Sequence, residues 1–536
     1  MAGQDPYAPR GAWEEGAPLI SPTLSESPFA PPLVPKKKKP WIVLIGVIYL
    51  LVAIIDVGAY LAEAPKTRVF EANLCIRYYE THDPSKIGPD GTVAEHLCKE
   101  DEIQQKLAMI FGWQDMFDAI PGILLAVPFG LLADRVGRKW VFAASLMGLQ
   151  FQLAWVLLIS YFRSLPLQLT WLSSVFLAMG GGPMVATAIG MTMVSDIVPP
   201  EKRTSVFLYL TASVLVAELL APILAARLME KGDYIPLLLA LAIQQLGIFL
   251  AMLFPETLHM RDLPEPKDAD DESIELQTKH HGYGFQAQMY HLKDAFAFLR
   301  SDYTLGLVVL TFLGNRLGRQ SITLLIRYAS KRYGWEIKKA AYLTSFRAAT
   351  NLVALTVFVP LVNIILLKRL RIAAHWADLW IARVSIALTT VSFLIMGVSA
   401  YPALLILGLL IYNLGTGYNA AMRSTSIHVV GGQSSPNIGR LMSLIAIVES
   451  IGSMFGGPLI NAMFQMGIER GGMWLGLPFF GAALVFAGMT FATASISVRD
   501  KDVLYSGLDT EDTMEPDSPL ANSPTWGREG PLRYST

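Results

Sequence analysis

The strongest constraint on this chain is a series of apolar segments, each long enough to cross a lipid bilayer. The first runs from Trp41 to Ala62, and five more follow at residues 107–132, 140–162, 168–194, 205–229 and 235–258. After a polar stretch, six further segments occupy residues 303–328, 339–367, 376–398, 402–430, 440–464 and 473–495. A helix needs about 20 apolar residues to span a membrane. The sequence therefore predicts an all-α membrane protein with twelve transmembrane helices, grouped as six plus six.

The composition supports a membrane protein and excludes several other classes. Of 536 residues, 53% are hydrophobic and 16% are charged, whereas soluble domains have about 25% charged residues. The formal net charge of -1 gives no basic field for nucleic acid. Two cysteines are too few for a disulfide framework or a thiolate metal cluster. We expect no enzymatic activity, no metal, no cofactor and no nucleic-acid partner.

Charge patterning divides the chain into five regions and predicts their orientation. Lys36 to Lys39 directly precede the first apolar segment, and basic residues near a first helix hold that end in the cytoplasm. Both termini are then cytoplasmic. The predicted regions are a disordered arm (1–40), a six-helix bundle (41–258), a cytoplasmic linker (259–301), a second six-helix bundle (302–495) and a disordered tail (496–536).

The two halves resemble one another when they are aligned with a shift of about 235 residues. Gly180-Gly181-Gly182 then falls on Gly415-Thr416-Gly417, and Ala221-Pro222 falls on Gly457-Pro458. This duplication predicts two pseudo-symmetric bundles. Small residues at such positions also let helix backbones approach closely, which explains most of these glycines without a substrate.

A charged motif lies between the second and third segments. It reads Gly130-Leu131-Leu132-Ala133-Asp134-Arg135-Val136-Gly137-Arg138-Lys139. It resembles the signature loop of the major facilitator superfamily, Gly-x-x-x-Asp-Arg-x-Gly-Arg-Lys, at the same place in a twelve-span chain. The resemblance implies a conformational latch between helices 2, 4 and 11, with Asp196 as the partner of Arg138. A basic loop that only fixes orientation is the alternative.

Further residues resemble fungal members of that superfamily that move drugs or secondary metabolites. Phe254-Pro255-Glu256-Thr257-Leu258 follows the sixth segment, and Gly452, Gly456 and Gly457 recur in the eleventh. Proton-coupled folate and organic-anion carriers are a second group of similar proteins. The resemblance therefore implies either export of a drug or metabolite or uptake of an organic anion.

Ionisable residues inside apolar segments are costly and are candidates for function. Tyr49, Asp56, Tyr60 and Glu63 recur at spacings of seven, four and three, so they share one helical face, which we expect to line a cavity. We predict that Asp56, Glu218 and Asp115 couple transport to protons. The predicted substrate cavity contains Tyr49, Trp113, Asp118, Arg316, Arg319 and Arg423. Two structural alternatives stay open: Asp115 and Asp118 are solvated or bond across helices, and the arginines pair with Glu449, Asp378 or exposed carbonyl groups at helix ends.

The two cysteines, Cys75 and Cys98, both lie in the predicted first outer loop. Because that loop faces an oxidising compartment in the predicted topology, we expect a disulfide between them rather than two free thiols.

The source of energy follows from a missing motif. The chain has no Gly-x-x-x-x-Gly-Lys-Ser/Thr phosphate loop, so transport would draw on a gradient rather than on nucleotide hydrolysis. We expect a monomer in the lipid bilayer of the plasma membrane that exports a small organic molecule in a proton-coupled, alternating-access cycle. Proton-coupled uptake of an organic anion is the second hypothesis, and a transporter-like receptor is the third.

Overall fold

The described part of the chain is helical throughout. The computed structural model describes residues 41–198, 200–258, 303–372, 374–430 and 438–496. These residues form α-helices with short 3₁₀ and π segments, and they contain no strand. The predicted arm 1–40, linker 259–301 and nearly all of the tail lie outside the described residues. The predicted all-α class is confirmed.

The first half of the chain contributes six helical runs. They are α1 (Trp41–His82), α2 (Asp101–Val136), α3 (Arg138–Tyr161), η3 (Leu167–Met179) with α4 (Gly182–Ile197), α5 (Pro200–Met229) and α6 (Ile235–Leu253). Two short 3₁₀ segments, η1 (Pro84–Lys86) and η2 (Glu95–Lys99), connect α1 to α2.

The second half contributes six more runs. They are α9 (Tyr303–Thr323) with α10 (Leu325–Tyr333), α11 (Ile337–Val353) with η5 (Ala354–Phe358), α12 (Val359–Ile364) and η6 (Ile365–Arg369), α13 (Ala374–Gly397), α14 (Pro402–Leu414) with η7 (Gly415–Gly417) and α15 (Tyr418–Val429), α16 (Ile438–Arg470), and η8 (Gly472–Gly476) with α17 (Leu477–Ser495). Each predicted segment therefore corresponds to one helix or helical run.

Length and hydropathy identify most of these runs as membrane spans. Among the described residues, nine qualify alone, and α2 makes a tenth when its two arms, bent by 51° before Pro128, count as one span. The other two runs, α9 with α10 and α16, pack against α17 in the second half. They carry charged residues such as Arg316, Arg319 and Glu449. That α9 with α10 and α16 also cross the membrane, which would complete the predicted twelve spans, stays a prediction.

The internal repeat is visible as matching helix breaks. Gly180 and Gly181 separate η3 from α4, and Gly415 to Gly417 separate α14 from α15. Gly181 has a positive φ of 79°, a conformation that glycine adopts at little cost. The aligned glycine triplets therefore mark the same interruption in the fourth span of each half.

The first helix is much longer than the apolar segment predicts. The sequence places the end of the first span at Ala62, but α1 continues to His82. The extension is polar, yet the tertiary structure buries much of it: Asn73 donates a hydrogen bond to the Ser160 carbonyl at 2.7 Å. The prediction that Cys75 lies in an outer loop is therefore wrong, since Cys75 lies on α1. A segment predicted from hydropathy ends where the apolar residues end, whereas the helix itself can continue because packing against other elements buries its polar residues.

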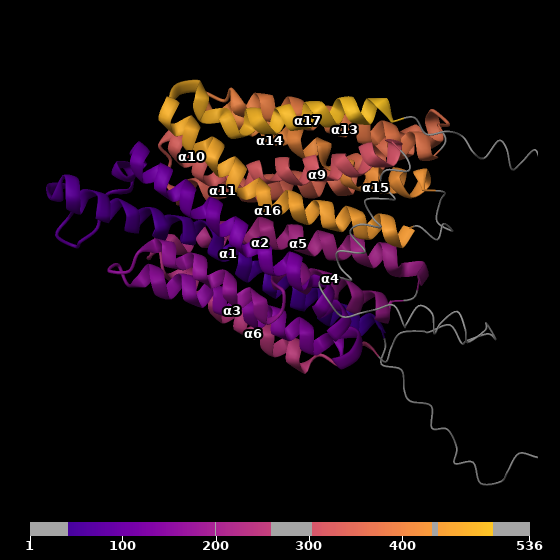
Figure 1. Ribbon diagram of the computed structural model, residues 1–536, viewed down its shortest axis with the longest axis horizontal. Coiled ribbons are helices and arrows are strands. Elements are labelled where there is room, and N and C mark those ends of the chain that lie inside the picture. Colours follow the sequence, from indigo (N-terminus) through magenta and orange to yellow (C-terminus); the bar gives the residue numbers. More distant parts are fainter. Residues whose placement is uncertain (1–40, 199, 259–302, 373, 431–437, 497–536) are drawn as a thin grey trace, which may run out of the picture.

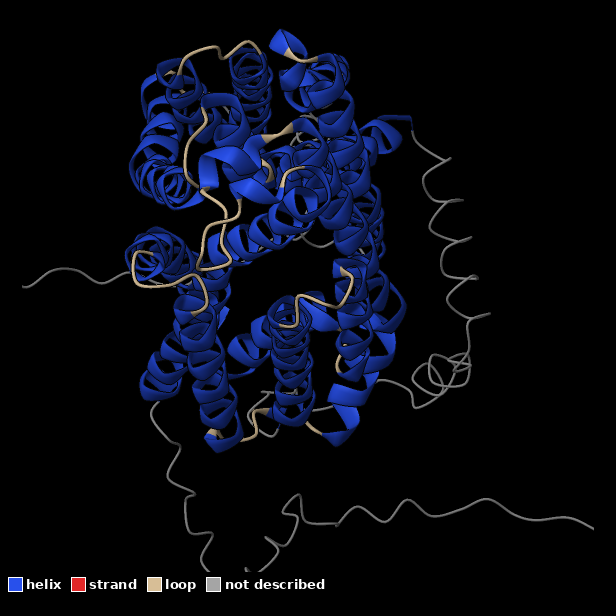
Figure 2. Ribbon diagram, turned by 90° about the vertical axis from the view of Figure 1, so that its left-hand side faces the viewer, coloured by secondary structure: helices blue, strands red, loops and turns tan. Residues whose placement is uncertain are grey.

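Two helix pairs form most of the contact between the halves. The helices of each half pack mainly with one another, and α2 packs along α16 while α5 packs along α11. Figure 2 shows the same arrangement from the left-hand side of Figure 1, with many helices seen end-on. At the α2/α16 contact, a side chain at Gly457 would collide with Asp115. Small residues therefore permit this close approach.

Candidate functional site

The charged motif lies at one end of the bundle, here called the motif end, and forms an ion-pair cluster around a buried arginine. Arg138 begins α3 and is 3% exposed. Its Nη1 lies 2.8 Å from Oδ2 of Asp196 on α4, and its Nη2 lies 3.2 Å from Oδ1 of Asp134 on α2. The guanidinium therefore connects three helices of the first half. Of the other motif residues, Gly130 lies in α2, Arg135 is exposed, and the Lys139 ammonium lies 5.1 Å from the centre of the Trp140 ring.

Glu256 completes this cluster, although the sequence does not indicate this role for it. Its carboxylate accepts hydrogen bonds from the backbone N–H groups of Arg138 at 2.9 Å and Lys139 at 3.3 Å. These groups begin α3, where backbone donors lack helical partners and negative charge is favoured. Gly137, with φ of 113°, turns the chain there, and a side chain on it would collide with the Glu256 carboxylate. The Phe254–Leu258 segment thus caps the helix that carries Arg138.

An internal cavity of about 680 Å³ lies among α1 to α6, with α9 and α10 contributing one residue each. Asp56, Asp115 and Asp118, three of the predicted site residues, line it together with Tyr60 and Glu63. The part of the predicted α1 face that carries Asp56, Tyr60 and Glu63 therefore borders a cavity. Pockets of this size are typical of sites for small organic molecules.

Tyr49 and Trp113 do not line this cavity, contrary to their predicted place. The Tyr49 hydroxyl donates to the Val206 carbonyl at 3.0 Å and so joins α1 to α5. Trp113 is 44% exposed and packs against Phe117 and Trp171, with ring centroids 5.8 and 6.3 Å away. Tyr49 lies seven residues, about two helical turns, from Asp56, so a shared helical face does not by itself bring both side chains to one cavity. Trp113 directly precedes Gln114 in α2, and neighbouring residues of a helix point in different directions.

The predicted cavity arginines of the second half also lie elsewhere. Arg316 donates from Nε to Ser453 Oγ at 2.7 Å, which joins α9 to α16. Arg423 donates from Nη2 to both carboxylate oxygens of Glu449 at 2.9 Å. Arg319 is likewise not among the residues that line the cavity. For Arg423, the structure therefore contains the alternative that the sequence left open, an ion pair with Glu449.

Glu218 lies between the two halves rather than in the cavity. It is 4% exposed on α5, and it forms an ion pair with Arg347 on α11. Because α5 and α11 belong to different halves, this buried pair connects the two bundles directly. The sequence contains both charges but gives no sign that they meet.

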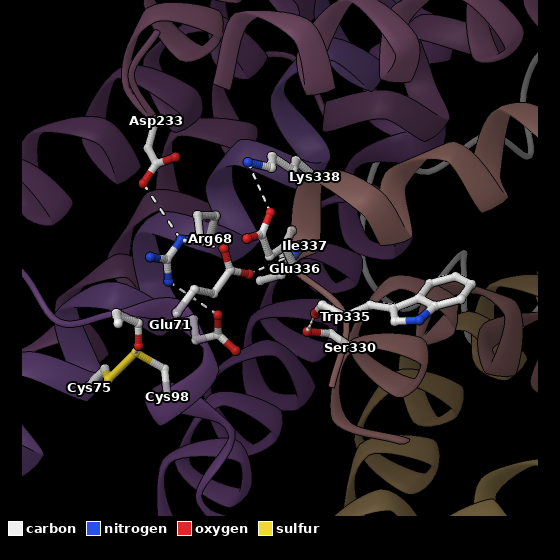
Figure 3. Close-up of polar contacts among 12 residues, drawn as sticks. Arg68, Glu71, Cys75, Cys98, Asp233, Ser330, Trp335, Glu336, Ile337 and Lys338 are labelled. Carbon is white, nitrogen blue, oxygen red and sulfur yellow. Dashed lines mark hydrogen bonds and ion pairs between the residues drawn. A yellow bond between two sulfur atoms is a disulfide. The ribbon is translucent and has the colours of Figure 1, made fainter. Parts of the chain in front are cut away.

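The opposite end of the bundle, here called the disulfide end, contains a second charged network. Cys75 on α1 and Cys98 in η2 form a disulfide, and Glu71, fully buried one turn before Cys75, accepts from Lys99 Nζ at 2.7 Å and from Gln104 Nε2 at 2.6 Å. Figure 3 shows Arg68 between Glu71 and Asp233, beside the disulfide. The α1 extension is thereby tied to the segment that follows it.

This network continues into the second half. Glu95 Oε1 accepts from the backbone N–H of Ile337 at 2.6 Å, at the first residue of α11 (Figure 3). Lys331 Nζ lies 2.5 Å from Oδ1 of Asp101. A carboxylate of one half thus caps a helix of the other. These contacts hold the halves together at the disulfide end.

Two carboxyl groups in the connecting loops of this end have shifted pKa values for different reasons. Burial raises the pKa of the Asp233 carboxyl, and the nearby Arg68 opposes that rise. The hydrogen bond from Lys338 lowers the pKa of the Glu336 carboxyl. Both loops adjoin the contact between the halves.

Removal of the disulfide gives a first prediction. We expect the double variant Cys75→Ser/Cys98→Ser to lose about 2–4 kcal/mol of local stability, since the bond closes a loop with a sequence separation of 23. Proteolysis should then cleave residues 83–100 faster. A reducing agent should produce the same change in the wild type and none in the variant. Equal proteolysis of both proteins under oxidising conditions contradicts the prediction.

Several residues at these sites are not predicted from the sequence. Lys66, Gln114, Gln244 and Arg327 line the cavity, and Arg347 holds Glu218. Lys66 lies beyond the predicted end of the first span. The glutamines are uncharged, so they are not among the ionisable residues that mark candidate sites in the apolar segments. Lys66 continues the helical face of Asp56 and Glu63, and this spacing is the sequence signal that indicates it.

Two bundles of membrane-spanning helices, with a charge-lined cavity in the first of them, are typical of membrane transporters. The Major Facilitator Superfamily profile matches residues 102–457. The chain belongs to this superfamily, and it is an integral membrane transporter for small molecules rather than an enzyme.

Similar proteins support this assignment. The efflux pump atnC of Emericella nidulans is 35% identical over 84% of this chain and 86% of its own length. The efflux pump ustT of Aspergillus flavus is 28% identical over 83% and 86%. Among solved structures, the nucleoside transporter NupG has a TM-score of 0.57 at 12% identity, and the human organic anion transporter MFSD10 has 0.54 at 17%. They cover 85% of this chain and 100% of their own chains, and they show the shared fold.

Proposed function

We propose that this transporter exports a small organic molecule in exchange for protons by alternating access. The observation that carries the proposal is the cavity of the first half, where Asp56 and Asp115 face space large enough for a substrate. The names of the similar fungal proteins, which describe efflux pumps, support export. Buried carboxylates that reach a cavity are the usual proton carriers in membrane transporters.

Glu218 suggests how proton binding acts on the conformation. A proton on this carboxylate removes the charge that attracts Arg347, which weakens the contact between α5 and α11. The two halves then separate more easily at that contact. Proton uptake and the change of access are thereby linked through one inter-bundle pair, which is the coupling that alternating access requires.

We place the motif end in the cytoplasm and the disulfide end outside. Arg135, Arg138 and Lys139 lie at the motif end, and Lys368 and Arg369 close the helical run that starts from the disulfide end at Ile337. Basic residues are enriched on the cytoplasmic side of membrane proteins. In this orientation both termini are cytoplasmic, the disulfide is external, and the motif serves as a cytoplasmic latch. A monomer in the plasma membrane is the simplest arrangement.

Uptake of an organic anion is the less favoured function. It depends on arginines that face the substrate, but Arg316 bonds to Ser453 and Arg423 is neutralised by Glu449. Arg327 does line the cavity, where it donates a hydrogen bond to Asn461. The cavity also contains four acidic residues. These contacts favour the export proposal.

The test uses purified protein in liposomes with an imposed pH gradient and an internal pH indicator. Addition of an exported substrate should move protons in the opposite direction. We expect Asp56→Asn and Glu218→Gln each to reduce this proton flux by about tenfold or more. Proton movement in the same direction as an organic anion overturns export, and normal coupling in both variants overturns the assigned proton sites.

A further inference from the structure

The wall of the cavity carries more negative than positive groups. Its acidic residues are Asp56, Glu63, Asp115 and Asp118, and its basic residues are Lys66 and Arg327. An acidic lining does not by itself identify a ligand. The partners of each group decide which of them is free to bind one.

Both cations already have partners. Arg327 Nη1 donates to Asn461 Oδ1 at 2.7 Å, and its guanidinium lies 4.3 Å from the centre of the Phe111 ring. The Lys66 ammonium lies 5.6 Å from the same ring. The four carboxylates of the wall outnumber its two cations, so an anionic ligand would meet an excess of negative charge and would have to displace the contacts of Lys66 and Arg327.

Several of the remaining polar groups of the wall offer hydrogen-bond acceptors that lack a protein donor. Asp118 accepts hydrogen bonds from two uncharged donors, Gln114 Nε2 at 2.8 Å and Ser174 Oγ at 2.5 Å. Because Gln114 is 5% exposed and turns its amide N–H groups toward Asp118, its Oε1 is left buried without a partner. Gln244 Oε1 is also buried without a hydrogen-bond partner. Asp56 forms no ion pair with any described residue.

These unmatched acceptors lie among apolar and aromatic side chains. Ile55, Phe70, Phe142, Leu146 and Met191 form part of the same wall. Buried acceptors without donors are costly, and a ligand that supplies N–H groups removes that cost. A ligand that fits must therefore combine an apolar body with a positively charged donor.

We propose that this cavity binds protonated organic amines, with Asp56 as the counter-ion of the ammonium and the free amide oxygens of Gln114 and Gln244 as additional acceptors. The proposal rests on the proposed export function and names its substrate class. It assigns the substrate site to the first half of the chain. A proton and the amine then compete for Asp56, so release of one favours binding of the other.

The test measures equilibrium binding of dansylcadaverine, a fluorescent primary amine, to purified protein in an uncharged detergent at neutral pH. Its N-acetyl derivative keeps the same body without the charge. We expect saturable binding of the amine and at least about tenfold weaker binding of the acetyl derivative. Unlabelled 4-phenylbutylamine should displace the probe, whereas 4-phenylbutyrate, which has the opposite charge, should not.

Variants assign the effect to the cavity. Asp56→Asn should weaken binding of the amine by about tenfold while leaving the acetyl derivative unchanged, which also shows that the variant is folded. Asp56→Glu should restore most of the affinity. Glu230→Gln, at an exposed acid outside the cavity, serves as the matched control. Absence of saturable amine binding, equal displacement by 4-phenylbutyrate, or an Asp56→Asn variant with wild-type affinity overturns the proposal.

This experiment is independent of the liposome test, because it uses no gradient and no transport. Amine binding without proton movement in liposomes refutes proton-coupled export and retains the substrate class. Proton-coupled export of molecules that are not amines, together with absent amine binding, refutes the substrate class and retains export.

Discussion

Replacement of Arg347 by glutamine is expected to destabilise the transporter by about 3–5 kcal/mol and to abolish most of its transport. The variant leaves the Glu218 carboxylate buried at the contact between the halves without the cation that now neutralises it. An unneutralised buried charge costs more than the ion pair itself contributes. Chemical denaturation of the purified protein measures the loss of stability, and the liposome assay measures transport.

A double-mutant cycle separates the pair from other effects of substitution. Glu218→Gln/Arg347→Gln removes both charges, so we expect it to be more stable than Arg347→Gln alone although it still lacks proton coupling. Lys338→Gln is a matched control, because Lys338 is 41% exposed in its side chain and pairs with its near neighbour Glu336. Additive effects of the two single substitutions would show that Glu218 and Arg347 do not interact.

Replacement of Arg138 by alanine is the second substitution with a large expected effect. Arg138 holds Asp134 and Asp196 through different nitrogens of one guanidinium, and the Asp196 side chain is 5% exposed. We expect a loss of about 3–5 kcal/mol in the stability of the first half and loss of transport. Thermal unfolding in detergent and the liposome assay provide the two measurements.

Lysine should not restore the wild-type behaviour at this position. A single ammonium lacks the planar fork that reaches two carboxylates on different helices, so Arg138→Lys should resemble Arg138→Ala. Lys139→Ala is the control on the neighbouring residue, because that ammonium contacts the adjacent Trp140 ring rather than a buried carboxylate. Wild-type stability and transport in Arg138→Ala would refute a structural role for the cluster and its proposed role as a latch.

The candidate site divides into residues that the sequence predicts well and residues that it does not. Asp134 and Arg138 lie four residues apart across the Gly137 turn, so local geometry alone brings them together. Asp56, Tyr60 and Glu63 share a helical face by spacing, and that face borders the cavity. The predicted places of Tyr49, Trp113, Arg316 and Arg423 in the same cavity are not supported, because each has its contacts elsewhere, and Arg319 does not line the cavity.

The amino-acid sequence by itself determined the helical class, the boundaries of most spans and the motif loop. These features depend on continuous apolar runs and on residues close together along the chain, which obey local rules. Only the tertiary structure decided that Arg347 neutralises Glu218, that α1 continues to His82, and that the acceptors of Gln114 and Gln244 line one cavity with Asp56. The physical reason is that burial and the choice of ionic partner depend on packing between distant helices, which no short segment of the chain contains.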